Sequence, residues 1–524
     1  MPPTRAVVYL IGAGPGDPGL ITTRGRQCLA AADVVLYDRL VHPRVLRFAR
    51  GDAERIDVGA SSPQPLEQEA ICYLLAEKAR EGKVVARLKW GDPFVFDRGG
   101  EEALFLHEQG VRFEVVPGIP AALAVPSYAG IPVTYPGGGD SLTFVRGHED
   151  EGDALPDVDW NRLASLKGTI VCYVGTRQLS GIVKALLAHG CPADQPAAVI
   201  YNGTLPSQLT IDGPLGELSE IATPPSPRAG AVLIVGRVAA LRANLRWFDE
   251  RPLFGKRVLV TRTREQAADF VDRLEVLGAD AVESPTIRLL PPEDYGPLDE
   301  ACAQASTFDW IVFTSVNGVE AFMSRLHAGP GDVRQLKGVR LCAIGPATAD
   351  RLRHYGIKVD LTPSEYRAEG VVQALRDTGD LSGRRILLPR ADIARELLAD
   401  ELRTSGADVV EVTAYRTVLR DAAVDGGPDV YRMLLDREID VVTFTSASTV
   451  RNFVQIHGVD AAPDLLQSAV VACIGPVTAE AARQCGIRPA VVADPHTIPA
   501  LVDAIVAYFQ GPGAHEGEPH HESR

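Results

Sequence analysis

The sequence lacks any apolar run long enough to cross a membrane. Its longest apolar stretches include AVVYLIGAG, AGAVLIVG and IDVVTFT, far short of the ~20 residues that a membrane-spanning helix requires. The first residues, MPPTRAVVYLIGAG, also lack the longer apolar core and the small-residue cleavage site of a secretory signal. We therefore expect a cytoplasmic protein that makes no contact with a membrane.

Cysteine is scarce and scattered along the chain. No CxxC pair or Cys/His cluster offers the ligand spacing of structural zinc, so we expect no metal. Isolated thiols of this kind are usually buried and reduced. The eight cysteines are Cys28, Cys72, Cys172, Cys191, Cys302, Cys342, Cys473 and Cys485.

Positive charge is in deficit, with 53 Lys and Arg against 68 Asp and Glu and a net charge of -15. Proteins that bind duplexes depend on clustered Lys and Arg side chains that contact phosphates. The composition therefore argues against a nucleic-acid partner.

The sequence does have the composition of a globular protein. Hydrophobic residues make up 46% and charged residues 23% of it, close to the globular averages. Single cores stop growing near ~250–300 residues, so a length of 524 residues predicts two or three domains. We expect the tail after Gln510, rich in Gly, Pro and charge, to be disordered, and we favour solvated side chains over metal ligands for its His515, His520 and His521.

The first half alternates short β-rich runs with helical stretches from Ala6 to Arg242. That rhythm predicts an α/β domain or a pair of them. We expect the acidic loop at 148–160 to separate two lobes, and the main domain boundary to fall near Phe254. The expected strands are AVVYLI, DVVLYD, VVARL, FEVVPG, LTFVRG, TIVCYVG, AAVIYNG and AVLIVG.

The second half contains an internal repeat. IVFTSVNGVEAF at 311–322 recurs as VTFTSASTVRNF at 442–453. CAIGPATADRLRHYGI at 342–357 recurs as ACIGPVTAEAARQCGI at 472–487. Each copy predicts a strand, a Thr-Ser turn and a helix, then a strand, a Gly-Pro-x-Thr turn and a helix, so two similar α/β lobes are expected. A hydroxyl between strand and helix is first of all an N-cap, but two copies at similar spacing favour a shared cleft at the carboxyl ends of the strands.

A glycine-rich loop, GAGPGDPGL at 12–20, follows the first expected strand and precedes a helix that Thr22 or Thr23 would cap. Such a loop brings the backbone close to a ligand. A dinucleotide site is the tempting alternative, but Asp17 occupies the third glycine position of that fingerprint and Pro15 removes an amide. We therefore disfavour a nicotinamide cofactor.

Six further blocks occur in order along the first half: VYLIGAGPGDPGLIT, ADVVLYDRLV, RLKWGDPFVFDRGGEE, VVPGIPAALAVPSYAGIPVT, YVGT and VIYNGT. Together they resemble the uroporphyrinogen-III C-methyltransferase family over nearly all of residues 5–240. The resemblance implies a two-lobed α/β tetrapyrrole-methylase fold that holds S-adenosylmethionine in the cleft between its lobes. It also implies a homodimer.

The same resemblance implies roles for individual residues. Asp38 matches the family's YDxLV acid, and at the end of a strand it is the residue that we expect to remove a proton after methyl attack. A helix cap is its alternative role. Methyl transfer from a sulfonium needs alignment and requires no metal. The residues implied for the cofactor cradle are Pro15, Gly91, Asp92, Val95, Ala121, Val174 and Gly203.

The chain departs from the family pattern at several positions. Ala60 stands where the family commonly has a lysine, so the proton-donor role of that lysine is not carried over. Trp90 replaces the first glycine of Gly-Gly-Asp-Pro and adds bulk at the expected cofactor wall. In addition, Asp97 replaces a glycine, Pro120 a threonine and Val174 a methionine.

The blocks of the second half are RVLVTRTREQAADFVDRLEVLGADAVESPTI, FTSVNGVEAF, IGPATA, ILLPRAD, VTAYRT, FTSASTV and IGPVTAEAA. They look like uroporphyrinogen-III synthase, over about residues 255–507. That resemblance implies two lobes joined by a pair of linkers. It implies closure of linear hydroxymethylbilane with inversion of the last pyrrole ring and without a cofactor, so positioning would supply much of the acceleration.

Tyr415, in the VTAYRT block, matches the family's tyrosine and would assist departure of the hydroxyl as a hydrogen-bond donor. A packing tyrosine is the alternative. Arg262 and Arg390 each come directly after an expected strand and are either carboxylate clamps or solvated surface arginines. The hydroxyls and helix N-termini expected to meet substrate carboxylates are at Thr314, Ser315, Thr348, Thr445, Ser446 and Thr478.

The sequence thus predicts an α/β enzyme with two activities: it closes hydroxymethylbilane to uroporphyrinogen III and methylates that product twice to precorrin-2. The alternative is a methyltransferase of the same fold acting on another acceptor, joined to a non-catalytic two-lobed sensor. An acidic protein must hold such polycarboxylate substrates with local arginines and backbone donors. The expected domains are the methylase at 1–245, the synthase at 255–510 with lobes at about 255–291 plus 417–510 and at 292–416, and a tail at 511–524.

Overall fold

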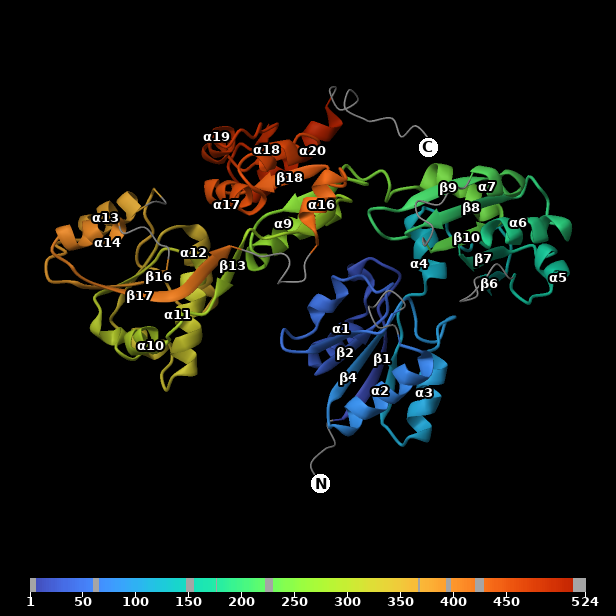
Figure 1. The fold of residues 1–524 in the computed structure, drawn as a ribbon, viewed down its shortest axis with the longest axis horizontal. Helices are drawn as coiled ribbons and strands as arrows, with labels where there is room; N and C mark the ends of the chain where they lie inside the picture. Colours follow the sequence, from blue (N-terminus) through green and yellow to red (C-terminus); the bar gives the residue numbers. More distant parts are fainter. Residues whose placement is uncertain are drawn as a thin grey trace. The chain divides into compact units, whose positions relative to one another are not determined.

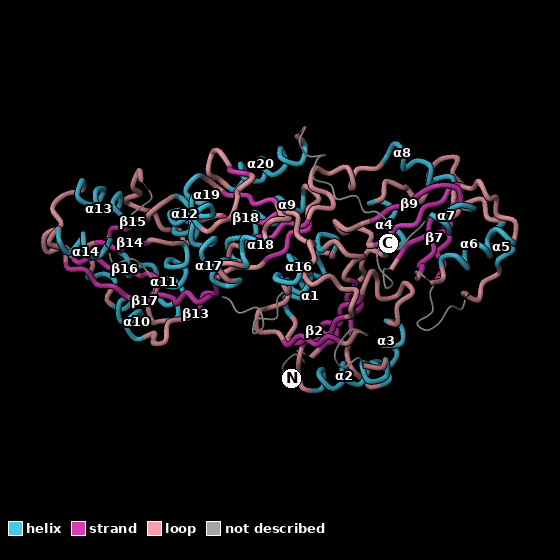
Figure 2. The backbone as a smooth tube through the Cα atoms, turned by 45° about the horizontal axis from the view of Figure 1, so that its top comes forward, coloured by secondary structure: helices cyan, strands magenta, loops and turns pink. Residues whose placement is uncertain are grey.

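Four five-stranded sheets, each with helices packed against it, organise the chain (Figures 1 and 2). The α/β class expected from the sequence is therefore confirmed. By compactness the chain forms two units: one holds the described residues up to Val258, Phe270–Ala281 and those from Val502 onward, and the other holds Leu259–Asp269 and Val282–Leu501. The computed structural model describes residues 6–59, 66–147, 155–175, 177–221, 230–365, 368–392, 397–419 and 428–511.

The first sheet is fully parallel, in the order β3-β2-β4-β1-β5. Its central strands β1, β2 and β4 are buried on both faces. On β1, Ile11 enters one apolar cluster, whereas Val8 and Leu10 enter the cluster on the other face. Such continuous apolar strands are typical of parallel sheets covered on two sides. The elements are β1 Val7–Gly12, α1 Thr23–Ala31, β2 Val34–Tyr37, β3 Glu54–Asp57, α2 Gln68–Arg80, β4 Val84–Lys89, α3 Gly99–Glu108 and β5 Phe113–Val116.

The second sheet is mixed, in the order β6-β7-β10-β8-β9. The β6 and β7 strands are parallel, whereas β10 runs antiparallel to both of its neighbours and β9 closes a hairpin with β8. The elements are α4 Ala121–Tyr128, β6 Leu142–Arg146, α5 Trp160–Ala164, β7 Thr169–Val174, α6 Leu179–Ala188, β8 Pro196–Tyr201, β9 Leu209–Pro214, α7 Leu215–Ile221, β10 Ala231–Val235 and α8 Arg242–Leu245.

The passage from the first sheet to the second lies between β5 and β6. Helix α4 packs on the second sheet, because Ala121, Ala122 and Val125 belong to the core on one of its faces. Our expectation that the acidic loop at 148–160 divides the lobes is wrong, since β6 already belongs to the second sheet before that loop. A run of acidic residues marks a solvated loop, and it need not lie where one sheet ends. Residues 148–154 of the loop lie outside the described residues.

The third sheet has the order β12-β11-β18-β19-β20 and joins segments that are far apart in the sequence (Figure 1). Thr261, just after β11, donates through its hydroxyl to the carbonyl of Thr443 at 2.7 Å, and Thr443 donates back to Leu259 at 2.8 Å. The elements are β11 Arg257–Val260, α9 Arg264–Val276, β12 Asp280–Glu283, α16 Val430–Leu435, β18 Val441–Phe444, α17 Ala447–His457, α18 Ala461–Leu465, β19 Val470–Cys473, α19 Pro476–Gln484, β20 Val491–Val492 and α20 Ile498–Gln510.

The fourth sheet has the order β13-β17-β16-β14-β15, with β13 antiparallel to β17 and the other pairs parallel. Apolar clusters lie on both of its faces. The elements are β13 Ile287–Leu290, α10 Gly296–Ala303, β14 Trp310–Phe313, α11 Val316–Ala328, β15 Arg340–Ala343, α12 Pro346–His354, α13 Ala368–Asp377, β16 Arg385–Ala391, α14 Leu397–Thr404 and β17 Asp408–Leu419.

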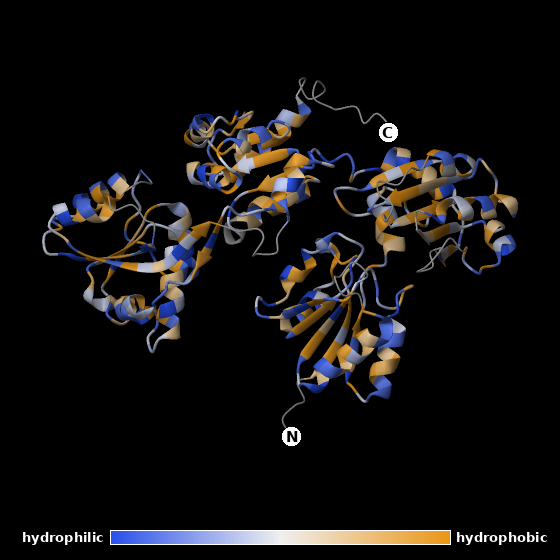
Figure 3. Ribbon diagram, in the orientation of Figure 1, coloured by the Kyte–Doolittle hydropathy of each residue, from blue (hydrophilic) through white to orange (hydrophobic). Residues whose placement is uncertain are grey.

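The internal repeat is confirmed as a repeat of structure. The succession β14-α11-β15-α12 in the fourth sheet recurs as β18-α17-β19-α19 in the third, where the short α18 is inserted between α17 and β19. Figure 3 shows the same hydropathy in all four sheets, with apolar strands inside and polar residues on the outer helix faces. Burial of the strands is therefore the organising force of every lobe.

The cysteines behave as the sequence indicates. All eight are free thiols, seven of them buried and Cys485 half-buried. Burial raises the pKa of the Cys473 thiol to about 11, which keeps it protonated and unreactive near neutral pH. Among the described residues, no three His, Cys, Asp or Glu side chains gather as a metal site, and no helix is long and apolar enough to span a bilayer.

Candidate functional site

Two glycine loops meet at the carboxyl ends of the neighbouring strands β1 and β4. Gly14 and Gly91 exchange backbone hydrogen bonds of 3.2 and 2.9 Å, and both have left-handed backbone, with φ of +80° and +68°. Only glycine adopts that conformation without strain. A Cβ on Gly12 would come within 2.4 Å of the amide nitrogen of Gly118, which follows β5. Three loops therefore pack backbone against backbone at the edge where open α/β sheets bind ligands.

Asp92 fixes the second of these loops. Its Oδ1 accepts from the backbone N–H of Phe94 at 2.9 Å, and its Oδ2 accepts from that of Gly118 at 3.0 Å. Both carboxylate oxygens are thus engaged by backbone donors, which hold the loop after β4 against the loop after β5. Direct contact of Asp92 with a cofactor stays a prediction.

Trp90 links this edge to the second sheet. Its Nε1 donates to the carbonyl oxygen of Pro15 at 2.7 Å, and its ring meets Tyr173 on β7 edge to face, with centroids 6.1 Å apart. The indole packs with Val95 and Ala121 against the core that α4 covers. The bulk expected at the cofactor wall is therefore held by one hydrogen bond and by close ring packing.

Gly203 packs closely against α4 within the second lobe, next to a residue that contacts the first lobe. A Cβ there would lie 2.4 Å from Cγ1 of Val125 on α4, so no other residue fits without a shift. The next residue, Thr204, accepts at Oγ1 from the backbone N–H of Asp17 in the first glycine loop, at 3.1 Å. Six predicted cradle residues are thus brought into one neighbourhood: Pro15, Gly91, Asp92, Val95, Ala121 and Gly203.

Val174, the seventh predicted cradle residue, points elsewhere. Its side chain is 2% exposed and belongs to the core on the opposite face of the second sheet. Its neighbour Tyr173 faces the Trp90 side and accepts from the backbone N–H of Ala122 at 3.1 Å. Because successive residues of a strand point to opposite faces, only the backbone of Val174 is available to the cradle.

Asp38 lies directly after β2 and is held by a buried arginine. Arg87 donates from Nη2 to Asp38 Oδ1 at 2.7 Å and from Nε to Glu102 Oε1 at 3.1 Å. Lys89 donates to the same Glu102 oxygen at 3.0 Å, and its Nζ lies 3.0 Å from Asp97 Oδ1. The result is an alternating line of charges, Asp38, Arg87, Glu102, Lys89 and Asp97, which we name the charge row.

The middle of the charge row is covered by protein, and its ends are not. Arg87, Lys89 and Glu102 are at most 1% exposed, whereas the side chains of Asp38 and Asp97 are 26% and 23% exposed. Arg87 and Lys89 share the face of β4 that α2 and α3 cover, since they alternate with residues of the other face. A carboxylate therefore stands at each accessible end of a buried ionic chain.

Burial and neighbouring charge compete within the charge row. Burial disfavours the Arg87 cation, but Glu102 and Asp38 together raise the pKa of the guanidinium above its ordinary value. Burial likewise disfavours the Glu102 carboxylate, but Arg87 and Lys89 bring the pKa of Glu102 below 4.5. At Asp97 burial prevails, and with the nearby charge of Asp38 it raises the pKa of that carboxyl. The interior pairs are thus held ionised, as buried charges must be.

In the fourth sheet the structure brings Tyr415 and Ser315 together. The Tyr415 hydroxyl lies 3.1 Å from Ser315 Oγ, and Ser315 also accepts from the backbone N–H of Gly318 as the N-cap of α11. Arg390 lies within the adjacent strand β16 and not after it as expected, and it is no solvated arginine, because it is buried and pairs with Glu411 at 2.5 Å. Tyr415 therefore faces the start of a helix, where the sequence expects substrate carboxylates.

The other predicted substrate residues lie at the corresponding turns. Ser446 caps α17 by accepting from Thr449 N at 3.2 Å, so the capping role first assigned to these hydroxyls is confirmed for both Ser315 and Ser446. Thr348 and Thr478 are each 4% exposed, and their hydroxyls are therefore largely covered. Thr314 and Thr445 follow their strands directly. Arg262 is the second residue after β11, and its substantial burial lowers the pKa of its guanidinium. Contact of any of them with substrate stays a prediction.

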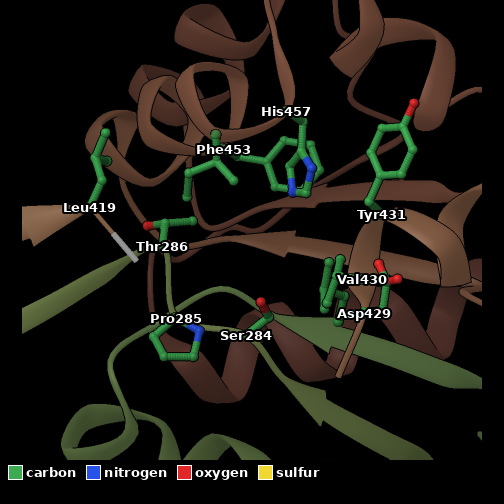
Figure 4. Close-up of a pocket in the computed structure, with 11 residues that line it drawn as sticks. Ser284, Pro285, Thr286, Leu419, Asp429, Val430, Tyr431, Phe453 and His457 are labelled. Atoms are coloured by element: carbon green, nitrogen blue, oxygen red, sulfur yellow. The ribbon is translucent and has the colours of Figure 1, made fainter. Parts of the chain in front are cut away.

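A separate cavity of about 490 Å³ lies in the third sheet's lobe, and none of the predicted residues lines it (Figure 4). Its wall is largely apolar, with His457 on α17 packed against Phe453, ring centroids 4.4 Å apart, and with Thr286 across from them. Burial lowers the pKa of His457, so the ring is neutral near neutral pH.

Sequence reasoning missed Arg87, Lys89, Glu102 and Tyr173. Arg87 and Lys89 gave a usable signal, because two cations at alternate positions of a strand that is otherwise apolar, VVARLK, must be paired when the strand is buried. Glu102 gave none, since an acidic residue in the first turn of a helix is ordinary. Ala60 lies outside the described residues.

The first half has two α/β lobes of the methylase type, with glycine loops at one sheet edge, and the second half has a duplicated pair of α/β lobes. This combination defines the class as a fused tetrapyrrole-modifying enzyme. The family model described as Tetrapyrrole (Corrin/Porphyrin) Methylases matches residues 7–219, and that described as Uroporphyrinogen-III synthase HemD matches residues 268–503. A porphyrin biosynthesis protein HemD from Ruminiclostridium josui is 38% identical over 504 residues, which cover 95% of this chain and 97% of the relative. The chain belongs to the family of fused uroporphyrinogen-III methyltransferase and uroporphyrinogen-III synthase enzymes of tetrapyrrole biosynthesis.

The methyltransferase half also matches proteins that are named methyltransferases alone. The uroporphyrinogen-III C-methyltransferase of Bacillus subtilis (strain 168) is 38% identical over 333 residues, 63% of this chain and 68% of the relative. A solved uroporphyrin-III C-methyl transferase from Thermus thermophilus, complexed with S-adenyl homocysteine, is 39% identical, with a TM-score of 0.39 and coverage of 45% of this chain and 99% of that one.

Proposed function

We propose that this chain closes hydroxymethylbilane to uroporphyrinogen III in its second half and methylates uroporphyrinogen III twice in its first half, giving precorrin-2. The methyl donor is S-adenosylmethionine, which supplies an electrophilic methyl group on a sulfonium. Membership of the fused family over nearly the whole chain supports both activities. We further propose that the methyltransferase half forms a homodimer.

The residues at the first sheet edge fit such a donor. A Cβ on Gly91 would meet no atom closer than 3.7 Å, so this backbone lies beside residues 119–121 at ordinary van der Waals distance and without crowding. Trp90 and Val95 are only partly buried and supply apolar surface, and α4 begins without a capping side chain at Pro120. The N–H of Ala122 is taken by the Tyr173 hydroxyl, and those of the next two residues are taken by the Pro120 carbonyl. At this helix start the N–H of Ala121 is therefore the donor that suits a carboxylate such as that of the methionine portion.

The observation that carries the methyltransferase proposal is the position of Asp38. It stands at the carboxyl end of β2, beside β4, at the same sheet edge as the Gly14 and Gly91 loops. Among the described residues its side chain bonds to Arg87 through Oδ1 alone, which leaves Oδ2 for a proton from substrate. Attack by a pyrrole carbon leaves the macrocycle with an extra proton at a bridging carbon, and Asp38 accepts it.

For the synthase half, the Tyr415 and Ser315 hydroxyls support a hydrogen-bond role at the leaving hydroxyl of hydroxymethylbilane. The helix starts at Ser315 and Ser446 present backbone N–H groups near the carboxyl ends of their strands. These donors are uncharged backbone groups that act only at short range. With them, a protein of negative net charge can bind a polyanionic substrate although it has no overall positive field.

A coupled assay tests the proposal. Full-length protein receives hydroxymethylbilane, with or without S-adenosylmethionine, and the products are resolved by chromatography and mass spectrometry. We expect the type-III isomer alone without the donor, and a product with two added methyl groups with it. Type-I isomer at the spontaneous rate would contradict the synthase assignment, and supplied uroporphyrinogen III that gains no methyl group would contradict the methyltransferase assignment.

A further inference from the structure

We propose that Asp97 is a positioning residue for Asp38: through Lys89, Glu102 and Arg87 it sets the direction and the charge balance of the carboxylate that takes the proton. This inference rests on the proposed methyltransferase function. It concerns a residue that stands where the family pattern has a glycine, and therefore a feature of this chain itself.

The physical connection between the two aspartates is continuous. Each step of the charge row is a contact of 2.7 to 3.1 Å between opposite charges. Two cations lie between three carboxylates, so the row carries one net negative charge when all five groups are ionised. Replacing the Asp97 carboxylate by a neutral group would bring that net charge to zero, in a setting that water screens poorly.

Glu102 makes the row sensitive to its outer end. Its Oε1 accepts from Arg87, Lys89 and Gln68 together, whereas its Oε2 is buried without a partner among the described residues. Lys89 is therefore shared between Glu102 and Asp97. Without Asp97, the full Lys89 charge falls on Glu102, and Glu102 holds Arg87 less firmly. Arg87 in turn is the group that orients Asp38.

The loop geometry aims Asp97 inward. Phe96, the preceding residue, has a left-handed backbone with φ of +53°, which is unfavourable for an aromatic residue. Its ring meets Tyr173 edge to face, with centroids 5.4 Å apart, and so offsets part of that strain. The reversal at Phe96 directs the Asp97 carboxylate to Lys89, and Oδ1 also accepts from the backbone N–H of Arg98 at 2.7 Å.

The electrostatics agree with this coupling. The pKa of Asp97 is raised by burial first and also by the charge of Asp38, so Asp97 lies within electrostatic reach of Asp38. Among the described residues, the groups that act on Asp97 are Lys89 on β4, Asp38 after β2 and the backbone N–H of Arg98; Arg87 and Glu102 reach it only through the charge row.

The test compares the Asp97→Asn, Asp97→Glu and Glu101→Gln variants of the full chain. Glu101 is the matched control, because it is an exposed carboxylate on the same segment and, within the described part of the chain, its ion pair is with Arg98. Single-turnover methylation of supplied uroporphyrinogen III is measured by mass spectrometry across a pH series. Calorimetry with S-adenosylhomocysteine reports the donor site, and thermal unfolding reports the fold.

For Asp97→Asn we expect methylation to slow about tenfold near neutral pH, less than the ~10²-fold or more that a general base itself contributes. The inflection on the acid side of the rate–pH profile moves to lower pH. Without the Asp97 carboxylate, the positive charges of Lys89 and Arg87 are neutralised less, and they disfavour protonation of the carboxylates that they contact. KM for donor and acceptor stays constant. Asp97→Glu restores at least half of the lost rate, and Glu101→Gln matches the parent chain.

Two outcomes would overturn the inference. One is an Asp97→Asn chain with the parent rate and pH profile. The other is an Asp97→Asn chain that methylates slowly with an unchanged pH profile, together with an Asp97→Glu chain that is equally slow, since that would be a purely structural effect. If Asp97→Asn does not fold, the pH profile of Asp97→Glu decides. Failure of the parent chain to methylate uroporphyrinogen III contradicts the proposed function instead, so the two failures are distinguishable.

Discussion

At the scale of single residues, the hydrogen bonds of aromatic side chains decide how the loops of both halves are held. Trp90 and Tyr415 each reach across to a different element, and each has a matched counterpart elsewhere in the chain. Substitutions that remove only the polar atom therefore separate the hydrogen bond from the packing of the ring.

Trp90→Phe removes the donor to the Pro15 carbonyl and keeps an aromatic ring beside Tyr173. We expect the free energy of unfolding of the methyltransferase half to fall by about 1 kcal/mol, and the donor affinity to weaken. Chemical denaturation and calorimetry with S-adenosylhomocysteine measure the two effects. Trp247→Phe is the control, because Trp247 also donates to a backbone carbonyl, at 2.9 Å to Ser127, but is 43% exposed. Equal losses in the two variants would show that the Pro15 bond has no special role.

Tyr415→Phe removes the hydroxyl that meets Ser315. If that hydroxyl assists the leaving group, formation of uroporphyrinogen III falls roughly 10²-fold, while methylation of supplied uroporphyrinogen III is unchanged. Chromatographic separation of the type-I and type-III isomers gives the rate. Tyr355→Phe in the same lobe removes a hydroxyl bonded to Glu320 at 3.0 Å and serves as the control. An unchanged synthase rate in Tyr415→Phe would make Tyr415 a packing residue.

At the scale of elements, strand β4 and helix α3 are joined by ion pairs between their side chains, whereas the elements around them are joined by apolar contacts. Glu102→Gln leaves Arg87 and Lys89 buried without their shared counter-charge. We expect the free energy of unfolding of this half to fall by about 3–5 kcal/mol at neutral pH. Glu101→Gln, an exposed substitution one residue away, should cost far less.

The pH dependence of that loss has a definite sign. The pKa of Glu102 is lower in the folded chain than its ordinary value of 4.5, so its ion pairs contribute stability above pH 4.5. That contribution is lost as the pH falls from 4.5 through the lower folded value. The gap in unfolding free energy between the parent chain and Glu102→Gln should therefore be full at neutral pH and should shrink in acid. A gap that is constant with pH would contradict the ionic account.

The elements themselves were largely predictable from the sequence. All eight strand runs expected in the first half appear, because each is a continuous apolar run bounded by turns. The strands β3 and β9 were missed, since both lie at sheet edges and carry exposed residues such as Glu54, Arg55 and Leu209. An edge strand satisfies the backbone through one neighbour and leaves little apolar pattern to detect.

The candidate site was predictable in part and for a similar reason. Glycines with forced conformations, such as Gly14 and Gly91, leave a signal in sequence, and so did Asp38 at a strand end. The pairing of Arg87 with Asp38 and Glu102 did not, because it depends on which face of β4 each residue occupies and on which helix covers that face. Such three-dimensional pairings carry no fixed spacing along the chain.

At the scale of the whole molecule, net charge sets the response to salt. The chain carries -15, and both proposed tetrapyrrole substrates are polyanions, so long-range repulsion opposes their encounter. Raising the ionic strength from about 10 mM to about 150 mM shortens the screening length from ~30 Å to ~8 Å. We expect kcat/KM for hydroxymethylbilane to rise by roughly twofold over this range.

The methyl donor provides the internal control for this prediction. S-adenosylmethionine carries a sulfonium, so its uptake should not be accelerated by salt. Stopped-flow or steady-state kinetics at fixed pH give both dependences. A kcat/KM for hydroxymethylbilane that falls steadily with salt would show that local arginines such as Arg262 and Arg390 attract the substrate from a distance and outweigh the overall charge.

The crossed threonine bonds between β11 and β18 have a consequence for biosynthesis. Thr261 and Thr443 are separated by 182 residues, so the third sheet is not complete until nearly the whole chain has left the ribosome. At ~5–20 residues per second, translation takes roughly 10–40 s to deliver the partner strand. During that interval the fourth sheet, encoded in between, is free to fold, while β11 waits with an apolar edge that a chaperone would recognise.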